Sequence, residues 1–235
     1  MSGHSKWHTI QKKKGAADAK RGQLFTKLAK AITVAAKTGG GGDPAFNFQL
    51  RVAIDSAKAA NMPKDNIERA VKRGTGEGAD TVIIEEVMYE GFGPGGVALL
   101  IHCLTDNRNR SIADVRTVMN KKGGNLGGQG SVKWMFDHKG LIVLAGELND
   151  ELELSLIDSG AEDIHVEDQM IEVVTASSDL KQVLDAIDQP TEHAGLVYLP
   201  KEAVALEEKA REQLDVLIDA LDALDDVDTV YTNMK

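Results

Sequence analysis

Apolar residues recur every three or four positions along residues 16–37, which is the spacing of one face of an α-helix. Leu24, Leu28 and Ile32 form this stripe, and glycines at 39–42 end it. The same period returns over 44–60 and again over 64–73. The pattern therefore predicts three short amphipathic helices that pack together as a bundle.

The start of the second helix is predicted from its capping residues. Asp43 is expected to be the N-cap, and Pro44 would occupy the first helical position, where its missing N–H has no cost. This start places Phe46 and Leu50 on the inward face. Pro63 ends the second helix, and Gly74 is expected to end the third.

The hydrophobic pattern changes after a polar linker at residues 74–80. Strands are predicted at 82–89, 97–104 and 132–136, with a helix at 109–122 between the last two. Near the C-terminus the pattern predicts a helix at 201–224 and a strand at 227–232. These elements together make one α+β domain.

Residues 140–199 read as a separate unit with the order strand, helix, strand, strand, helix, strand. The strands are predicted at 141–144, 163–166, 171–175 and 195–199, and the helices at 150–159 and 178–187. This βαββαβ order is ferredoxin-like. We therefore predict an α+β fold class with three domains: a basic arm and helical domain at 1–75, a discontinuous α+β domain at 80–138 plus 201–235, and an inserted ferredoxin-like domain at 139–200.

Charge is divided unevenly along the chain. The net charge is −10, but residues 1–75 contain 15 Lys and Arg against 5 Asp and Glu, and the remaining residues contain 12 against 32. A basic module on an acidic body indicates an anionic partner such as nucleic acid.

No apolar run is long enough to span a membrane, and the single cysteine, Cys103, excludes a disulfide framework. We therefore expect a cytoplasmic protein without a membrane partner.

Nucleic-acid contacts are predicted at the basic residues of the arm and first helix, with one aromatic among them. Lysines neutralise phosphates without reading bases, and Trp7 either stacks on a base or packs on the bundle. The start of the helix at 109–122 is a second candidate contact, although Asn109 or Ser111 there has the alternative role of a simple N-cap. The predicted contacts are Lys6, Trp7, His8, Lys12, Lys13, Lys14, Lys20, Arg21, Lys27, Lys30, Arg108 and Arg110.

Two glycine motifs have competing interpretations. Gly91-x-Gly93-x-x-Gly96 matches a dinucleotide fingerprint in letters, but it joins two predicted strands, so a hairpin is favoured. The glycine-rich segment 123–130 is either an RNA or protein contact or a loop without a role.

Catalytic chemistry is not indicated by any motif. None of the six histidines lies in a sequence motif typical of hydrolases or metalloproteases, so we expect that the protein is not an enzyme. His4 and His8 lack a third metal ligand nearby, so we expect no bound metal, and we expect no cofactor. A metal-dependent nuclease built from dispersed acids is the lower alternative. A further alternative is an adaptor that binds another protein through the acidic domains.

Several long motifs carry a resemblance to a known family. The blocks are Met1–His8, Phe25-Thr-Lys-Leu, Asn61–Ala70, Tyr89–Gly96, Thr105–Arg110, Gly123–Gly127, Ser131–Phe136 and the ending Asp226–Asn233. Together they resemble the YebC family over the whole chain. The resemblance implies a helical N-terminal domain and two α+β domains. It also implies a probable transcriptional regulator that binds DNA or, as in other members, a translational activator on the ribosome. The physiological target, DNA operator or ribosomal RNA, and the oligomeric state are left open.

Overall fold

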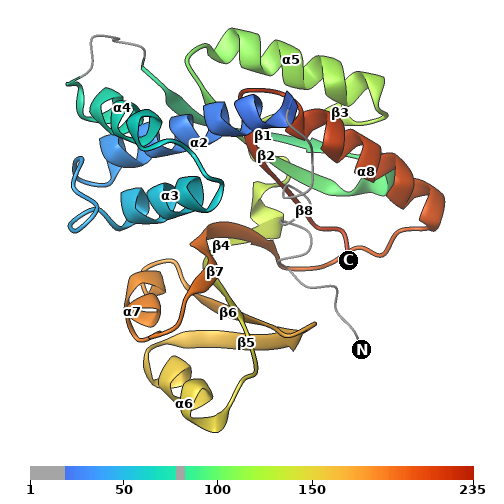
Figure 1. The fold of residues 1–235 in the computed structure, drawn as a ribbon. Coiled ribbons are helices and arrows are strands. Elements are labelled where there is room, and N and C mark those ends of the chain that lie inside the picture. Colours follow the sequence, from blue (N-terminus) through green and yellow to red (C-terminus); the bar gives the residue numbers. More distant parts are fainter. Residues whose placement is uncertain (1–18, 78–82) are drawn as a thin grey trace. The chain divides into compact units, whose positions relative to one another are not determined.

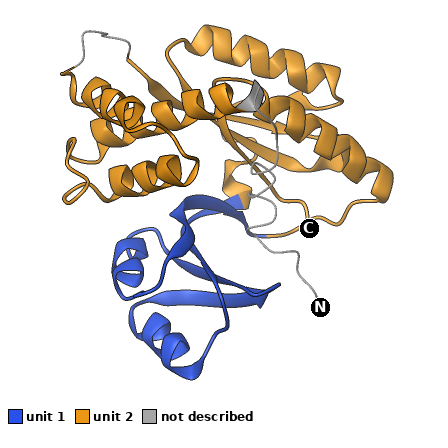
Figure 2. Ribbon diagram, viewed as in Figure 1, with its two compact units in different colours: residues 1–12, 136–201 blue, residues 13–135, 202–235 orange. Residues whose placement is uncertain are grey.

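The computed structural model describes residues 19–77 and 83–235, with side chains from residue 21 onward. It is an α+β protein with two four-stranded antiparallel sheets in the described part. Of the described residues, 136–201 form one compact unit and all others form a second (Figure 2). The second unit therefore includes both the helical region and the α+β elements on either side of 136–201 in the chain.

Three helices make the N-terminal part of the larger unit: α2 (Ala19–Thr38), α3 (Phe48–Ala59) and α4 (Lys64–Thr75). Their core contains the fully buried Ile32 and Leu50. Helices α2 and α4 approach closely at Gly74, where a Cβ atom would lie 2.4 Å from the carbonyl oxygen of Thr33. Gly74 thus lies within α4 rather than ending it, and the predicted three-helix bundle is confirmed.

The second helix begins later than its capping residues suggested. Asn47 is the N-cap, and its side chain accepts a hydrogen bond from the N–H of Leu50 at 3.0 Å while donating to the carbonyl of Ala35 at 2.8 Å. Asp43 and the proline after it form a turn instead, closed by the N–H of Phe46 on the Asp43 carbonyl. The inward placement of Phe46 was wrong, because this turn leaves its side chain 88% exposed.

The first sheet has the strand order β3-β1-β2-β8, and two helices pack on one of its faces (Figure 1). The core between sheet and helices includes Ile101, Met119 and Leu217, all fully buried. The elements are β1 (Glu85–Phe92), the 3-10 turn η1 (Pro94–Gly96), β2 (Ala98–Thr105), α5 (Arg108–Lys121), β3 (Asn125–Leu126), the 3-10 turn η2 (Lys133–Met135), α8 (Glu208–Asp222) and β8 (Val227–Thr232).

The hairpin interpretation of the first glycine motif is confirmed. Strands β1 and β2 pair antiparallel from Phe92 opposite Ala98, and the N–H of Gly93 donates to the Val97 carbonyl at 2.8 Å. Gly95 has a φ of 73°, a left-handed conformation that favours glycine. The motif therefore shapes a tight turn.

Three boundaries in this sheet differ from expectation. The predicted helix from 201 begins only at Glu208, because Val204 forms an extended bridge with Met234 at the C-terminus. The predicted strand at 132–136 is a 3-10 turn that passes into the next strand at Phe136. The N-cap of α5 is Asn107, whose side chain accepts from two following N–H groups, so neither Asn109 nor Ser111 has that role.

The smaller unit has the predicted βαββαβ order and the strand order β5-β6-β4-β7, which is ferredoxin-like. Its buried core includes Leu141, Leu156 and Ile171. Phe136 and Pro200 lie opposite each other in the register of its first and last strands, so the two chain ends of this unit are neighbours. The elements are β4 (Phe136–Ala145), α6 (Asp150–Asp158), β5 (Ala161–Glu167), β6 (Met170–Ala176), α7 (Leu180–Asp185) and β7 (Thr191–Pro200).

No helix within the described ranges is both long and apolar enough to cross a membrane. The longest helix described, α2, carries five Lys or Arg residues after its first position.

A histidine between two carboxylates joins three strands of the first sheet. His102 on β2 lies 2.9 Å from a carboxylate oxygen of Glu86 on β1 and 3.1 Å from one of Asp228 on β8. Its side chain is only 16% exposed. Burial alone would lower the pKa of His102, but the hydrogen bonds that its ring donates to both carboxylates outweigh this effect and raise the pKa to about 9.

The raised pKa of His102 predicts that the protein loses stability as the pH becomes alkaline. The stabilisation is fully present below the unfolded-state pKa near 6.5 and is lost as pH rises through about 9. We expect the variant His102→Gln to lower the free energy of unfolding near pH 6, by up to about 3 kcal/mol. The difference from wild type should shrink toward pH 10, measured by urea unfolding across this range.

His165 supplies the matched control, because it pairs with Asp163 at 2.7 Å while both side chains are about half exposed. An exposed pair contributes little to stability, so His165→Gln should leave the pH profile nearly unchanged. A loss in His102→Gln that is the same at pH 6 and pH 10 would contradict the account.

Candidate nucleic-acid interface

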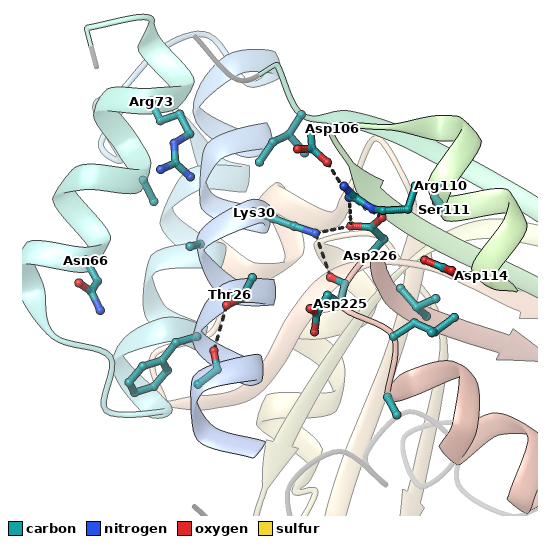
Figure 3. A pocket seen from close by; sticks show the side chains of 18 of the residues that line it. Thr26, Lys30, Asn66, Arg73, Asp106, Arg110, Ser111, Asp114, Asp225 and Asp226 are labelled. Carbon is teal, nitrogen blue, oxygen red and sulfur yellow. Dashed lines mark hydrogen bonds and ion pairs between the residues drawn. The ribbon is translucent and has the colours of Figure 1, made fainter. Parts of the chain in front are cut away.

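A large cleft lies in the larger unit, where α2, α4, the start of α5 and the turn before β8 meet (Figure 3). Its volume is about 960 Å³. Helix α4 supplies one wall through Asn66, Arg69 and Arg73, and the start of α5 supplies another. The cleft is the place where predicted contacts from the N-terminal helices and from the start of α5 come together.

A buried carboxylate, Asp226, forms the floor of this cleft. The Lys30 ammonium on α2 donates to it at 2.6 Å, the Arg110 guanidinium on α5 donates at 2.9 Å, and the Thr105 hydroxyl at the end of β2 donates at 2.9 Å. The side chain of Asp226 is 9% exposed. One carboxylate near the C-terminus thus connects α2, near the N-terminus, with the neighbouring ends of β2 and α5.

The Asp226 cluster is charged at neutral pH. Burial alone would raise the pKa of Asp226, but the hydrogen bonds from Lys30, Arg110 and Thr105 outweigh it and hold the pKa below its ordinary value. Arg110 also donates to Asp106 at 2.6 Å. The stabilisation from Asp226 is present above the pKa of the unfolded chain and is lost as pH falls through the lower folded-state value.

Further hydrogen bonds attach α2 to the turn that follows α8. The Lys27 ammonium donates to the Asp222 carbonyl at 2.6 Å, and Lys30 donates to the Asp225 carbonyl at 3.0 Å. The Gln23 amide donates to the Asp225 carboxylate at 2.9 Å. Side chains from three successive turns of α2 therefore contact one short segment near the C-terminus.

Helix α4 contributes cleft residues that the sequence analysis missed. Asn66, Arg69 and Arg73 follow at spacings of three and four, which places them on one face of the helix. Arg69 donates to the Asn66 amide oxygen at 3.4 Å and forms no ion pair with any described residue. The helical spacing of these polar groups was visible in the sequence and could have identified this wall.

The predicted contacts of the arm lie outside the described residues: Lys6, Trp7, His8, Lys12, Lys13 and Lys14. Lys20 lies in the first turn of α2, and the described side chains begin after it. Arg21 is exposed and pairs with no acid in the described part of the chain. Lys27 and Lys30 point instead to internal acceptors, so their charges stabilise the fold.

The two predicted arginines of the second candidate contact have different environments. Arg108 pairs with Glu85 at the surface, and its backbone carbonyl accepts from the Tyr89 hydroxyl at 3.2 Å. Arg110 is about half exposed, with Asp106 and Asp226 as its partners. A phosphate at either arginine would compete with these carboxylates, and the role of both in nucleic-acid binding stays a prediction.

The charges of the cleft constrain its chemistry. Its cations, Lys30, Arg69, Arg73 and Arg110, face the acids Asp106, Asp114, Asp225 and Asp226. The acids concentrate at α5 and the turn before β8, so the α4 wall is the more cationic one. Among described residues no group of three His, Cys, Asp or Glu side chains is arranged to hold a metal ion.

Removing the charge of Asp226 should loosen α2 from the α+β elements. Asp226→Asn keeps the shape of the side chain but leaves Lys30 and Arg110 without their shared counter-ion, and breaking a buried pair costs roughly 3–5 kcal/mol. We expect a clear loss in the free energy of unfolding and faster amide hydrogen exchange in α2, measured by urea unfolding and by exchange mass spectrometry.

Asp225→Asn is the matched control for this variant. Asp225 is the adjacent residue, is exposed, and accepts from a neutral amide, so its loss should cost well under about 1 kcal/mol. Equal and small effects of the two variants would contradict the role assigned to the Asp226 cluster.

Two models of one protein family together match most of the chain. Residues 5–77 match the TACO1/YebC protein N-terminal domain, and residues 84–234 match the TACO1/YebC second and third domain. A protein of Geobacter sulfurreducens named "Probable transcriptional regulatory protein" is 52% identical over 237 residues, covering 99% of this chain and 95% of that protein. A protein of Roseiflexus castenholzii with the same name is 49% identical, covering 100% and 95%.

A solved structure has the same fold. The crystal structure of a conserved hypothetical protein from Aquifex aeolicus superposes with a TM-score of 0.87 at 41% sequence identity, covering 98% of this chain and 97% of that one. The matches to both family models, the relatives and this structure lead to one conclusion: the chain belongs to the TACO1/YebC family.

Proposed function

We propose that this protein is a non-enzymatic regulator of gene expression that binds nucleic acid through its N-terminal 75 residues. The observation that carries the proposal is the division of charge, with 15 basic against 5 acidic residues in this segment and 12 against 32 in the rest. Phosphate neutralisation by lysine and arginine dominates the affinity of such proteins. The names of the relatives, as transcriptional regulatory proteins, support a regulatory role.

Exposed cations of the helices support the same assignment. Arg21, Lys37 and Lys72 are exposed and form no ion pair with any other described residue. They would add to the arm lysines Lys12, Lys13 and Lys14 in attracting a phosphate backbone. The net negative charge of the remaining residues would repel nucleic acid, which favours the basic module as the main contact.

DNA is our first candidate target, with weak sequence preference. A recognition helix must enter the major groove and present side chains to base edges. The polar face of α4, with Asn66, Arg69 and Arg73, lines a cleft opposite α5 and is therefore not presented to a groove. Lysines elsewhere supply affinity without base discrimination.

Ribosomal RNA is the second candidate, in which the protein acts as a translation factor. A folded RNA offers a fixed surface that a basic arm can bind by shape and charge, without reading bases. A metal-dependent nuclease is less favoured, because the cleft acids Asp106 and Asp226 are used in ion pairs with Arg110 and Lys30.

Affinities for a set of ligands test the proposal. At about 150 mM salt we expect several unrelated duplexes of about 30 base pairs to bind within about tenfold of one another, because phosphate contacts dominate. A preference of about a thousandfold or more for one promoter would establish operator recognition and contradict our expectation. Tighter binding to ribosomal RNA than to every duplex would favour the translation role.

The same assay assigns binding to the arm. The triple variant with Lys12→Gln, Lys13→Gln and Lys14→Gln should bind every ligand about tenfold or more weakly. The slope of log affinity against log salt concentration should become shallower by roughly two to three, because that many phosphate contacts are lost. The control combines Lys181→Gln, Lys201→Gln and Lys209→Gln, which removes equal charge from exposed positions elsewhere. Equal losses in both triple variants would place binding outside the arm.

A further inference from the structure

The glycine-rich segment after α5 is held in place by a buried glutamate. Glu90 on β1 accepts hydrogen bonds from the N–H groups of Gly130 at 2.6 Å and of Val132 and Lys133 at 2.8 Å. Its backbone carbonyl also accepts from the N–H of Gly127 at 2.8 Å. Burial alone would raise the pKa of Glu90, but the three backbone hydrogen bonds outweigh it and lower the pKa, so the anchor is charged.

An exposed tryptophan follows directly on this anchored segment. Trp134 is 67% exposed, although it is one of only two tryptophans in the chain. Its indole N–H donates to the Ser131 carbonyl at 3.2 Å, and Val132 beside it is fully buried. The ring is therefore attached to a fixed support while most of its surface faces solvent.

The stretch of sequence that leads to this tryptophan differs in charge from the acidic body. Residues 115–136 contain four basic residues and no acidic one, although the chain after residue 75 has 32 acids against 12 bases. Lys121 and Lys122 are exposed at the end of α5 and form no ion pair with described residues, and the exposed Lys133 precedes Trp134. This acid-free segment is complementary to an anionic partner.

We propose that Trp134 is a stacking platform for an unpaired base of single-stranded nucleic acid, with the lysines of the acid-free segment attracting the adjoining phosphates. An aromatic ring stacks on the face of a base, and that face is free only when the base is not stacked in a duplex. A pre-oriented ring loses little conformational entropy on binding. This assignment rests on the proposed nucleic-acid function and adds a second contact, which selects unpaired bases.

Tryptophan fluorescence observes this contact directly. In Trp7→Phe, Trp134 is the one remaining tryptophan, and the full-length variant can be titrated to saturation with a 15-nucleotide unstructured RNA. We expect strong quenching by this strand. A strand of equal length whose central nucleotides are abasic keeps the phosphates but has no bases to stack, so it should bind with little quenching.

Affinity measurements on variants provide the second readout. Trp134→Ala should weaken binding of the intact strand by about tenfold or more, while its affinity for the abasic strand stays within about twofold of wild type. Trp134→Phe should restore part of the loss, since a smaller ring still stacks. Leu154→Ala is the control, because Leu154 is an equally exposed apolar residue, 61% exposed, on α6 of the other unit.

The outcomes separate the two proposals. If wild type binds the intact strand and Trp134→Ala binds it equally well, the stacking assignment is overturned and the arm-based function stands. If wild type binds no nucleic acid, both are overturned. A blue shift of Trp134 emission that grows with protein concentration alone would assign the ring to a contact between copies of this chain and overturn the stacking role.

Discussion

The arrangement of the larger unit depends on a single buried carboxylate. Asp226 accepts from Lys30, Arg110 and Thr105, which come from a helix near the N-terminus, a helix in the middle of the chain and the end of a strand. A buried charge without partners is strongly unfavourable, so the Asp226 carboxylate favours the arrangement in which these elements meet. The helical region and the α+β elements consequently form one compact unit among the described residues, although residues 136–201 separate their parts in the chain.

The Asp226 cluster also determines which cations remain for a partner. Lys30 and Arg110 are predicted phosphate contacts, and in the fold both also form ion pairs with Asp226. The cationic surface therefore shifts toward Arg21, Lys37 and Lys72 and toward the arm. The polar face of α4 lines the cleft beside this cluster, which is the physical reason to expect weak base readout.

Much of the fold was predictable because the local spacing of apolar residues indicates which segments are helices and which are strands. The strand at 227–232 matches β8, and the βαββαβ order of the smaller unit follows from alternating patterns with clear turns. Local signals failed where a distant partner decides the structure. Nothing near Glu90 in sequence indicates that its carboxylate holds the amides of 130–133, which turned a predicted strand into a 3-10 turn.

The site was less predictable than the fold for the same reason. Lys30 and Asp226 are 196 residues apart, so no spacing rule connects them. The α4 wall was accessible to a helical-spacing argument, whereas Phe46 was misplaced because Asn47 was a stronger cap than Asp43. Charge balance over long segments, by contrast, does not depend on tertiary contacts, and it is the sequence property from which the functional proposal follows.

The most direct test of the account is ultraviolet crosslinking of the protein to nucleic acid in living cells. Mass spectrometry would locate the crosslinked peptides, and sequencing would identify the nucleic acid. The account predicts crosslinked peptides within residues 1–75 and in the acid-free segment 115–136. Crosslinks confined to residues 136–201 would contradict it. So would a recovery of nucleic acid from the wild-type protein that is no greater than from the variant with Lys12, Lys13 and Lys14 replaced by glutamine.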